Sequence, residues 1–322
     1  MNKMIHFRSV LAEQMQQFVD FKRMQGHDYS DQAWKLSCFD SFLFEKYDGV
    51  QNPFLHLDML QAFVATTTHL AGYTRCDRLS ALREFSRYLH ARNPSSVILP
   101  RDIVPGCKST LRFYRITPEQ VADLMKATMM VLPPESIRTH AIRMLIGLLY
   151  CTGLRIREAL NLTIGDIDMK DSMLHVTKGK FAKQRLVPMS PSTLAALSKY
   201  LAIRESYAST NRCSALFIGA YDKALSRQQA YRGFCRLCQH CGLDGTPLPR
   251  FHDLRHNYAC QRLALWREEG KDVNAMLPVL ATTMGHAKFF YTQTYFHIEL
   301  GDLRWAASRL NTHFNTHLEK KQ

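Results

Sequence analysis

The sequence has no run of about 18 consecutive apolar residues, the length that a membrane-spanning helix needs. Its first ten residues, MNKMIHFRSV, also lack the apolar stretch of a secretory signal peptide. Internal repeats and low-complexity tracts are missing as well. These absences exclude a membrane protein and predict a cytoplasmic, globular chain.

Acidic side chains are scarce relative to basic ones. The chain carries 28 Asp and Glu against 42 Lys and Arg, a formal net charge of +14. The excess is +3 in residues 1–113 and +11 in residues 114–322. A basic surface of this kind attracts polyanions, so double-stranded DNA or another nucleic acid is the first partner to consider.

Nine cysteines form an odd set in a chain without an export signal, which favours reduced thiols over a disulfide framework. Cys235, Cys238 and Cys241, with His240 beside them, have a spacing that invites a metal site. An iron–sulfur run would require a fourth cysteine about four residues on, where the chain has Gly245. Small buried residues on a helix explain the spacing better, and we expect no metal and no cofactor.

Four amphipathic segments occupy the first hundred residues, because their apolar side chains recur at intervals of three and four. They lie at about 10–25, 31–46, 57–68 and 75–92. Three prolines without a helical period follow in residues 93–106, as in an extended linker. The sequence therefore predicts an N-terminal helical bundle over residues 1–106 and a linker at about 93–113.

The second domain, residues 114–322, is predicted to be mainly helical with a small antiparallel β-sheet. Thr117 and Gln120 form a capping box that opens a helix, and an apolar helix from about 137 should end near Gly153. Residues 174–176 and 185–189 are β-rich and flank the basic connector KGKFAKQ, which indicates a hairpin. Further helices are expected at 191–205, 226–240, 252–267, 273–284 and 289–298.

Three short motifs in this domain carry side chains suited to an anionic oxygen. CTGLRIREALNL places Arg155 at the start of a helix, and FHDLRHNYA places His252 and Arg255 on one helix face. GHAKFFYTQTYFHIEL follows, with His286 nine residues before Tyr295. Each motif alone is compatible with ordinary surface residues, but the ordered set points to one site.

At these motifs, and at the hairpin TKGKFAKQRLVPMSPST, the sequence resembles the tyrosine recombinase (phage integrase) family over about residues 115–300. The resemblance implies that Arg155 and Arg255 grip a scissile DNA phosphate. It also implies that His252 and His286 bond its oxygens or assist proton transfer, and that Tyr295 is the nucleophile. Tyr291, only five residues after His286, is expected to pack.

Two further roles follow from the resemblance. Glu158 matches a frequent family acid that orients the arginine. The family also has a catalytic lysine in the hairpin, where this chain offers Lys178, Lys180 and Lys183. Counting back from Arg185 selects Lys180, whereas counting forward from the strand favours Lys178.

The resemblance implies a site-specific recombinase that cuts and rejoins DNA through a 3′-phosphotyrosyl intermediate, without metal or ATP. It implies a tetramer on two duplexes at the nucleoid, with accessory recombinases as further partners, and an N-terminal domain that clamps DNA. Few residues precede the first helix, so we expect an Xer-like or mobile-element type acting in integration, excision or transposition. The rivals are a type IB topoisomerase-like enzyme and a DNA-binding relative without catalysis.

The segment after Tyr295 has apolar residues at helical spacing. They are Leu303, Ala306, Ala307, Leu310 and Phe314. This pattern fits a helix packed on its own domain. The family resemblance implies instead that the helix docks into a neighbouring protomer.

Overall fold

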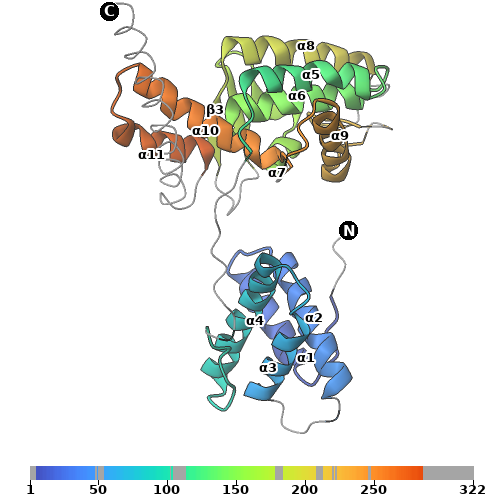
Figure 1. The fold of residues 1–322 in the computed structure, drawn as a ribbon, viewed down its shortest axis with the longest axis vertical. Coiled ribbons are helices and arrows are strands. Elements are labelled where there is room, and N and C mark those ends of the chain that lie inside the picture. The colour runs from blue at the N-terminus through green and yellow to red at the C-terminus, as the bar shows by residue number, and fades with distance from the viewer. Residues whose placement is uncertain are drawn as a thin grey trace, which may run out of the picture. The chain divides into compact units, whose positions relative to one another are not determined.

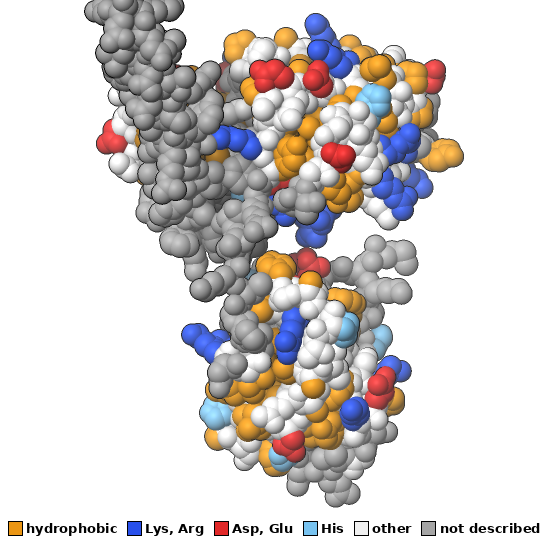
Figure 2. Space-filling model, viewed as in Figure 1, with side chains coloured by type: hydrophobic (Ala, Val, Ile, Leu, Met, Phe, Trp, Pro, Cys, Tyr) orange, Lys and Arg blue, Asp and Glu red, His pale blue; other side chains and the backbone are white. Residues whose placement is uncertain are grey.

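The computed structural model describes residues 5–285, apart from 48, 50–53, 102, 104–113, 178–183, 208–212, 220, 222 and 246–247. The chain divides into two compact units, Met1–Leu111 and Arg112–Gln322 (Figure 1). On the face shown in Figure 2, Lys and Arg side chains are spread over both units. Within the described ranges, none of the helices combines the length and apolar character that a membrane crossing requires.

The first unit is a bundle of helices around an aromatic core. Phe18, Phe39 and Phe85 are fully buried, and Phe39 meets Phe63 edge to face at 4.9 Å. The helix α4 begins three residues earlier than the sequence pattern predicts, because its first turn is exposed and lacks an apolar period. The helices are α1 (Ala12–Met24), α2 (Ser30–Lys46), α3 (Leu57–Thr66) and α4 (Gly72–Arg92).

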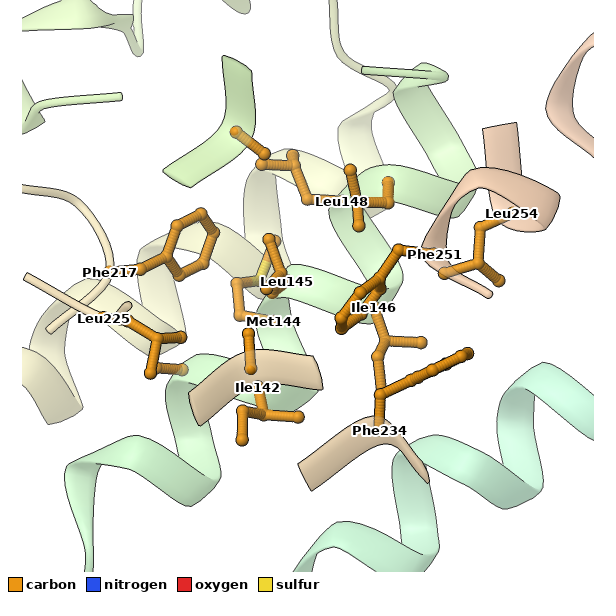
Figure 3. Close-up of a cluster of buried hydrophobic side chains, with 14 of the residues drawn as sticks. Ile142, Met144, Leu145, Ile146, Leu148, Phe217, Leu225, Phe234, Phe251 and Leu254 are labelled. Carbon is orange, nitrogen blue, oxygen red and sulfur yellow. The ribbon is translucent and has the colours of Figure 1, made fainter. Parts of the chain in front are cut away.

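The second unit is built around one buried helix, α6, which packs against α5, α8 and α10 (Figure 1). Apolar residues surround α6 on most sides, as expected of a helix in the centre of a domain. Figure 3 shows Leu145 and Ile146 of α6 among Phe217, Phe234 and Phe251. The helices of this unit are α5 (Pro118–Val131), α6 (Ile137–Thr152), α7 (Ile156–Leu160), α8 (Pro191–Tyr207), α9 (Arg227–His240), α10 (Phe251–Glu268) and α11 (Val273–Met284).

The sheet of the second unit has three antiparallel strands in the order β1-β2-β3. They are β1 (Ile167–Asp168), β2 (Met173–Val176) and β3 (Arg185–Pro188), and β1 follows the short 3₁₀ helix η1 (Ile164–Asp166). The β2–β3 pairing, with Leu174 opposite Val187, confirms the predicted hairpin. β1 has only two residues, too few to show an alternating pattern in the sequence. The fold is mainly helical with a small antiparallel sheet, as predicted.

Two local signals read from the sequence set helix ends in this unit. Thr117 accepts a hydrogen bond from the Gln120 backbone at the start of α5, which confirms the capping box. Gly153 ends α6 in the left-handed conformation, with φ +64°, as the common glycine C-cap does. A Cβ at this position would lie 2.3 Å from Cδ1 of Tyr258. The glycine is therefore required both by backbone conformation and by space.

Gly153→Ala should lower the free energy of unfolding of the second unit by about 3 kcal/mol, since left-handed strain adds to a forced shift of Tyr258. Gly270 is the matched control. It has φ +69°, and no atom lies within 4 Å of where its Cβ would stand, so Gly270→Ala bears the backbone strain alone. Its expected cost is about 1 kcal/mol. Urea unfolding of both variants measures the difference, and equal costs would contradict a close fit at Gly153.

Candidate active site

Arg155 lies at the N-cap of α7, three residues after the end of α6. Its Nη1 donates to Oε1 of Glu158 at 2.8 Å, and its Nη2 donates to the carbonyl oxygen of Gly285 at 2.8 Å. Nη1 also lies 3.4 Å from the carbonyl oxygen of Met284. The side chain is 26% exposed, so the guanidinium is anchored and still reachable from solvent.

Arg255 comes from α10 and is almost fully buried, with 1% of its surface exposed. Its Nη1 donates to the carbonyl oxygen of Gly153 at 2.6 Å, and its Nη2 donates to that of Met284 at 2.8 Å. A buried guanidinium is costly unless hydrogen bonds replace its hydration. Carbonyl groups at the ends of α6 and α11 accept these bonds, and the Met284 carbonyl accepts from both Arg155 and Arg255.

Arg185, at the start of β3, also belongs to the site, although no motif in the sequence indicates this. Its Nη1 and Nη2 donate to Oε1 and Oε2 of Glu158 at 3.2 and 2.7 Å, and its Nε donates to the carbonyl oxygen of Thr283 at 2.8 Å. This two-pronged geometry is the strong form of an arginine–carboxylate pair. Glu158 thus binds two arginines, where the family resemblance implied one.

Glu158 is ionised in the folded protein over the whole neutral and mildly acidic range. Burial alone would raise its pKa, but hydrogen bonds from Arg185 and from the Arg155 backbone, together with the charge of Arg185, lower the pKa from 4.5 to about 2. A carboxylate with a depressed folded-state pKa stabilises the fold above its unfolded pKa. That stability is lost as the pH falls from about 4.5 toward 2.

Glu158→Gln should therefore destabilise the protein at pH 6 by about 3 kcal/mol relative to the wild type, the free energy that corresponds to this pKa difference. The gap should shrink as the pH falls from about 4.5 toward 2, because the unfolded wild type then binds a proton at this carboxylate that the folded protein does not bind. Urea unfolding of both proteins between pH 6 and 3 measures it. A gap that does not change with pH would show that Glu158 contributes by packing instead of charge.

His252 precedes Arg255 by one turn of α10 and lies at the surface. Its ring meets that of His256 edge to face at 4.4 Å. Desolvation by surrounding protein and the positive charge of Arg255 lower the pKa of His252 to about 4. Because the residue is exposed, its desolvation is only partial. The positive charges of Arg255, Arg250 and Arg155 also disfavour protonation of the ring, so they lower its pKa as well. The imidazole is neutral at pH 7.

Two buried polar residues hold α10 in place around His252 and Arg255. Asp253 accepts hydrogen bonds from the backbone and side chain of Arg250 at the helix start. The side-chain amide of Asn257 accepts from the Ile116 N–H at 3.2 Å and donates to the Tyr114 carbonyl at 3.1 Å. Asp253 is a local cap of α10, whereas the partners of Asn257 lie more than 140 positions away and are set by the fold. Asn257 fastens the segment that enters the second unit to the helix carrying Arg255.

The structure brings together four of the predicted site residues: Arg155, Glu158, His252 and Arg255. The other predicted ones, His286, Tyr295, Lys180 and the alternative Lys178, lie outside the described residues, as do Tyr291 and Lys183. His286 directly follows Gly285, whose carbonyl oxygen binds Arg155.

The site concentrates positive charge from segments far apart in the chain: α7, β3 and α10. Guanidinium groups are permanently charged and offer planar pairs of donors that match phosphate oxygens. Within the described ranges, no group of three or more His, Cys, Asp and Glu side chains is placed to hold a metal ion. Arginines held in place before a ligand arrives can stabilise the negative charge that develops on a phosphate during displacement.

Comparison with known proteins identifies the same region. Residues 114–300 match the model of the phage integrase family. An integrase/recombinase of Sinorhizobium fredii, y4rE, is 31% identical over 95% of this chain and 97% of its own length. Tyrosine recombinase XerC of Herpetosiphon aurantiacus is 29% identical, over 89% of this chain and 91% of its own.

Solved structures share the fold. The XerH site-specific recombinase bound to palindromic difH substrate, in a post-cleavage complex, has a TM-score of 0.65 at 22% identity and covers 87% of this chain and 79% of its own. The Tn1549 transposon integrase in complex with transposon right end DNA has a TM-score of 0.65 at 15% identity, with 92% and 99% covered. At these low sequence identities, the similarity to the solved structures shows a shared fold.

Proposed function

This chain belongs to the phage integrase family of tyrosine recombinases and is a site-specific DNA recombinase, and from that premise we propose which of its residues carry out the reaction. Tyr295 attacks the scissile phosphorus and becomes linked to the 3′ phosphate. Arg155 and Arg255 bind the non-bridging oxygens. The observation that supports this most directly is that both arginines donate to the Met284 carbonyl, two residues before His286.

The chemistry requires proton transfers at both ends of the displacement. An unperturbed phenol has a pKa of about 10, so Tyr295 must lose its proton as it attacks. His252, neutral at pH 7 because its pKa is about 4, can accept a proton, and His286 can donate a hydrogen bond. Lys180, with Lys178 as the alternative, protonates the leaving 5′ oxygen. The phosphotyrosyl ester keeps the energy of the broken bond, so rejoining needs no ATP.

The DNA partner is a pair of double-stranded recombination sites bound by more than one protomer, and we infer a tetramer on two duplexes. XerH and the Tn1549 integrase, which share the fold, were solved with DNA. The basic excess of the second unit supplies phosphate contacts. The first unit acts as a DNA clamp. Relatedness to integrases and Xer recombinases favours recombination over relaxation of supercoils by a topoisomerase.

Trapping the covalent intermediate tests this function. The protein is expressed in cells, denatured with detergent, and the DNA that remains attached is sequenced. We expect one short site, with inverted repeats, to be strongly enriched. Attached DNA without a common sequence would contradict site specificity, and a total lack of attached DNA from a folded protein would contradict the covalent mechanism.

Cleavage should not depend on a divalent metal, since the arginines and histidines supply the charge and the donors that metal ions provide in many nucleases. On a nicked suicide substrate of the recovered site, the rate of adduct formation should change by less than about twofold when EDTA is added. A loss that added magnesium restores would point to a metal-assisted mechanism.

A further inference from the structure

Two arginines and one carboxylate share a buried cluster beside the phosphate site. Glu158, 4% exposed, binds Arg155 through Oε1 and Arg185 through both oxygens. Arg185 is the more buried arginine of this cluster, with 9% of its side chain exposed against 26% for Arg155. Arg155, the more exposed of the two, can also reach a ligand, whereas the guanidinium of Arg185 is directed at the carboxylate.

The charge of this cluster depends on Arg185. With both arginines present, Glu158 cancels one positive charge and a net charge of +1 remains. Without Arg185, Glu158 and Arg155 would form a neutral pair, because among the described residues these two arginines are the side chains that donate to this carboxylate. Interactions between charges are strong where water is scarce. The two-pronged bond from Arg185 to Glu158, at 3.2 and 2.7 Å, is what prevents that neutralisation.

Arg185 also fixes the end of α11. Its Nε binds the Thr283 carbonyl at 2.8 Å, and its guanidinium lies so close to Gly285 that a Cβ there would be 2.7 Å from Nη1. The opposite arginine, Arg155, binds the carbonyl oxygen of the same glycine. Arg185 also lines a cavity of about 230 Å³ at the ends of β2 and β3, together with His175 and Gln184.

We propose that Arg185 is a positioning residue for strand cleavage: it neutralises Glu158 and thereby leaves the charge of Arg155 available to the scissile phosphate. This inference rests on the proposed function, because it assigns Arg155 to the phosphate. Arg185 itself does not contact the DNA. Its effect is transmitted through the shared carboxylate.

The test compares a charged with an uncharged scissile group. The substrate is the suicide duplex of the recovered site, made with either an ordinary phosphate or a methylphosphonate, in which a methyl group replaces one charged oxygen. Arg185→Met should slow adduct formation by about 100-fold on the phosphate, the usual effect of losing one stabilising charge, relative to the wild type on the same substrate. On the methylphosphonate the loss should be under about 5-fold, since less charge has to be stabilised.

A second variant tests the same idea without modified DNA. Adding Glu158→Gln to Arg185→Met removes the carboxylate that would neutralise Arg155, so cleavage of ordinary DNA should recover by at least about 10-fold. If the methionine variant does not fold, Arg185→Gln, which is neutral but polar, replaces it in both comparisons. Equal losses on both substrates, with no recovery in the double variant, would overturn the proposal.

Arg204→Met is the matched control for the loss of a buried arginine. Arg204 is 3% exposed and binds the Cys213 and Ala215 carbonyls, in contacts separate from the Glu158 cluster. It should lower thermal stability and leave the ratio of the two cleavage rates unchanged. Failure of the wild type to form any adduct would count against the proposed function instead, so the two ideas fail in different ways.

Discussion

Tyr295→Phe is expected to reduce covalent protein–DNA adducts to below detection while DNA binding stays within about twofold of the wild type. The change removes one hydroxyl, which is the proposed nucleophile of the 3′-phosphotyrosyl bond. Affinity for DNA comes mainly from many phosphate contacts, to which a single phenol adds little. Denaturing gels with a labelled suicide substrate measure the adduct, and gel shifts measure binding.

Tyr291→Phe is the internal control for this experiment. It removes a hydroxyl four residues away on the same segment and should leave adduct formation within about twofold of the wild type. Adducts that persist in Tyr295→Phe and vanish in Tyr291→Phe would exchange the two assignments. Loss in both variants would indicate that the second hydroxyl also takes part in the reaction.

Arg255→Lys should slow strand cleavage by about 100- to 1,000-fold, although the positive charge is kept. The arginine uses separate nitrogens for the Gly153 and Met284 carbonyls, at 2.6 and 2.8 Å. A lysine has one nitrogen on a flexible stem and cannot hold both carbonyls while it faces a phosphate. Single-turnover cleavage of the suicide substrate measures the loss.

Arg262→Lys provides the comparison on the same helix. Arg262 lies over the ring of Trp266, 5.2 Å from its centroid, and has no contact with the Met284 carbonyl among the interactions described. The same chemical change there should alter the cleavage rate by less than about twofold. Similar losses in both variants would mean that cleavage depends on the stability of α10 and not on the two hydrogen bonds of the Arg255 guanidinium.

The sequence predicted those features that depend on neighbours in the chain. Gly153 ends α6 because a left-handed residue is needed there, and Thr117 and Gln120 cap α5 three residues apart. The apolar period located the described helices to within a few residues, and the β2–β3 hairpin followed from two β-rich runs. The helix predicted at 289–298 lies outside the described residues. Arg155, His252 and Arg255 could be predicted as site residues because they lie in short motifs whose order along the chain is visible in the sequence.

The remaining features depend on contacts between distant segments. Arg185 and Glu158 are 27 positions apart, and nothing in either neighbourhood indicates that they form a buried pair. Asn257 likewise binds backbone groups of Tyr114 and Ile116, more than 140 positions away. Such partners are determined by the packing of α10 and β3 against the rest of the unit. The predicted roles of His286, Tyr295 and Lys180 stay predictions.

The backbone oxygen of Met284 accepts hydrogen bonds from both Arg155 and Arg255, so the positions of the two guanidinium groups depend on each other. A shift of the last turn of α11 would change both of these bonds and the bond from Arg155 to the Gly285 oxygen. Substitutions that move this turn should therefore fail in an all-or-none manner, whereas changes near only one arginine can be graded. In a library of α11 variants, intermediate activities should be rare at the positions nearest to Met284.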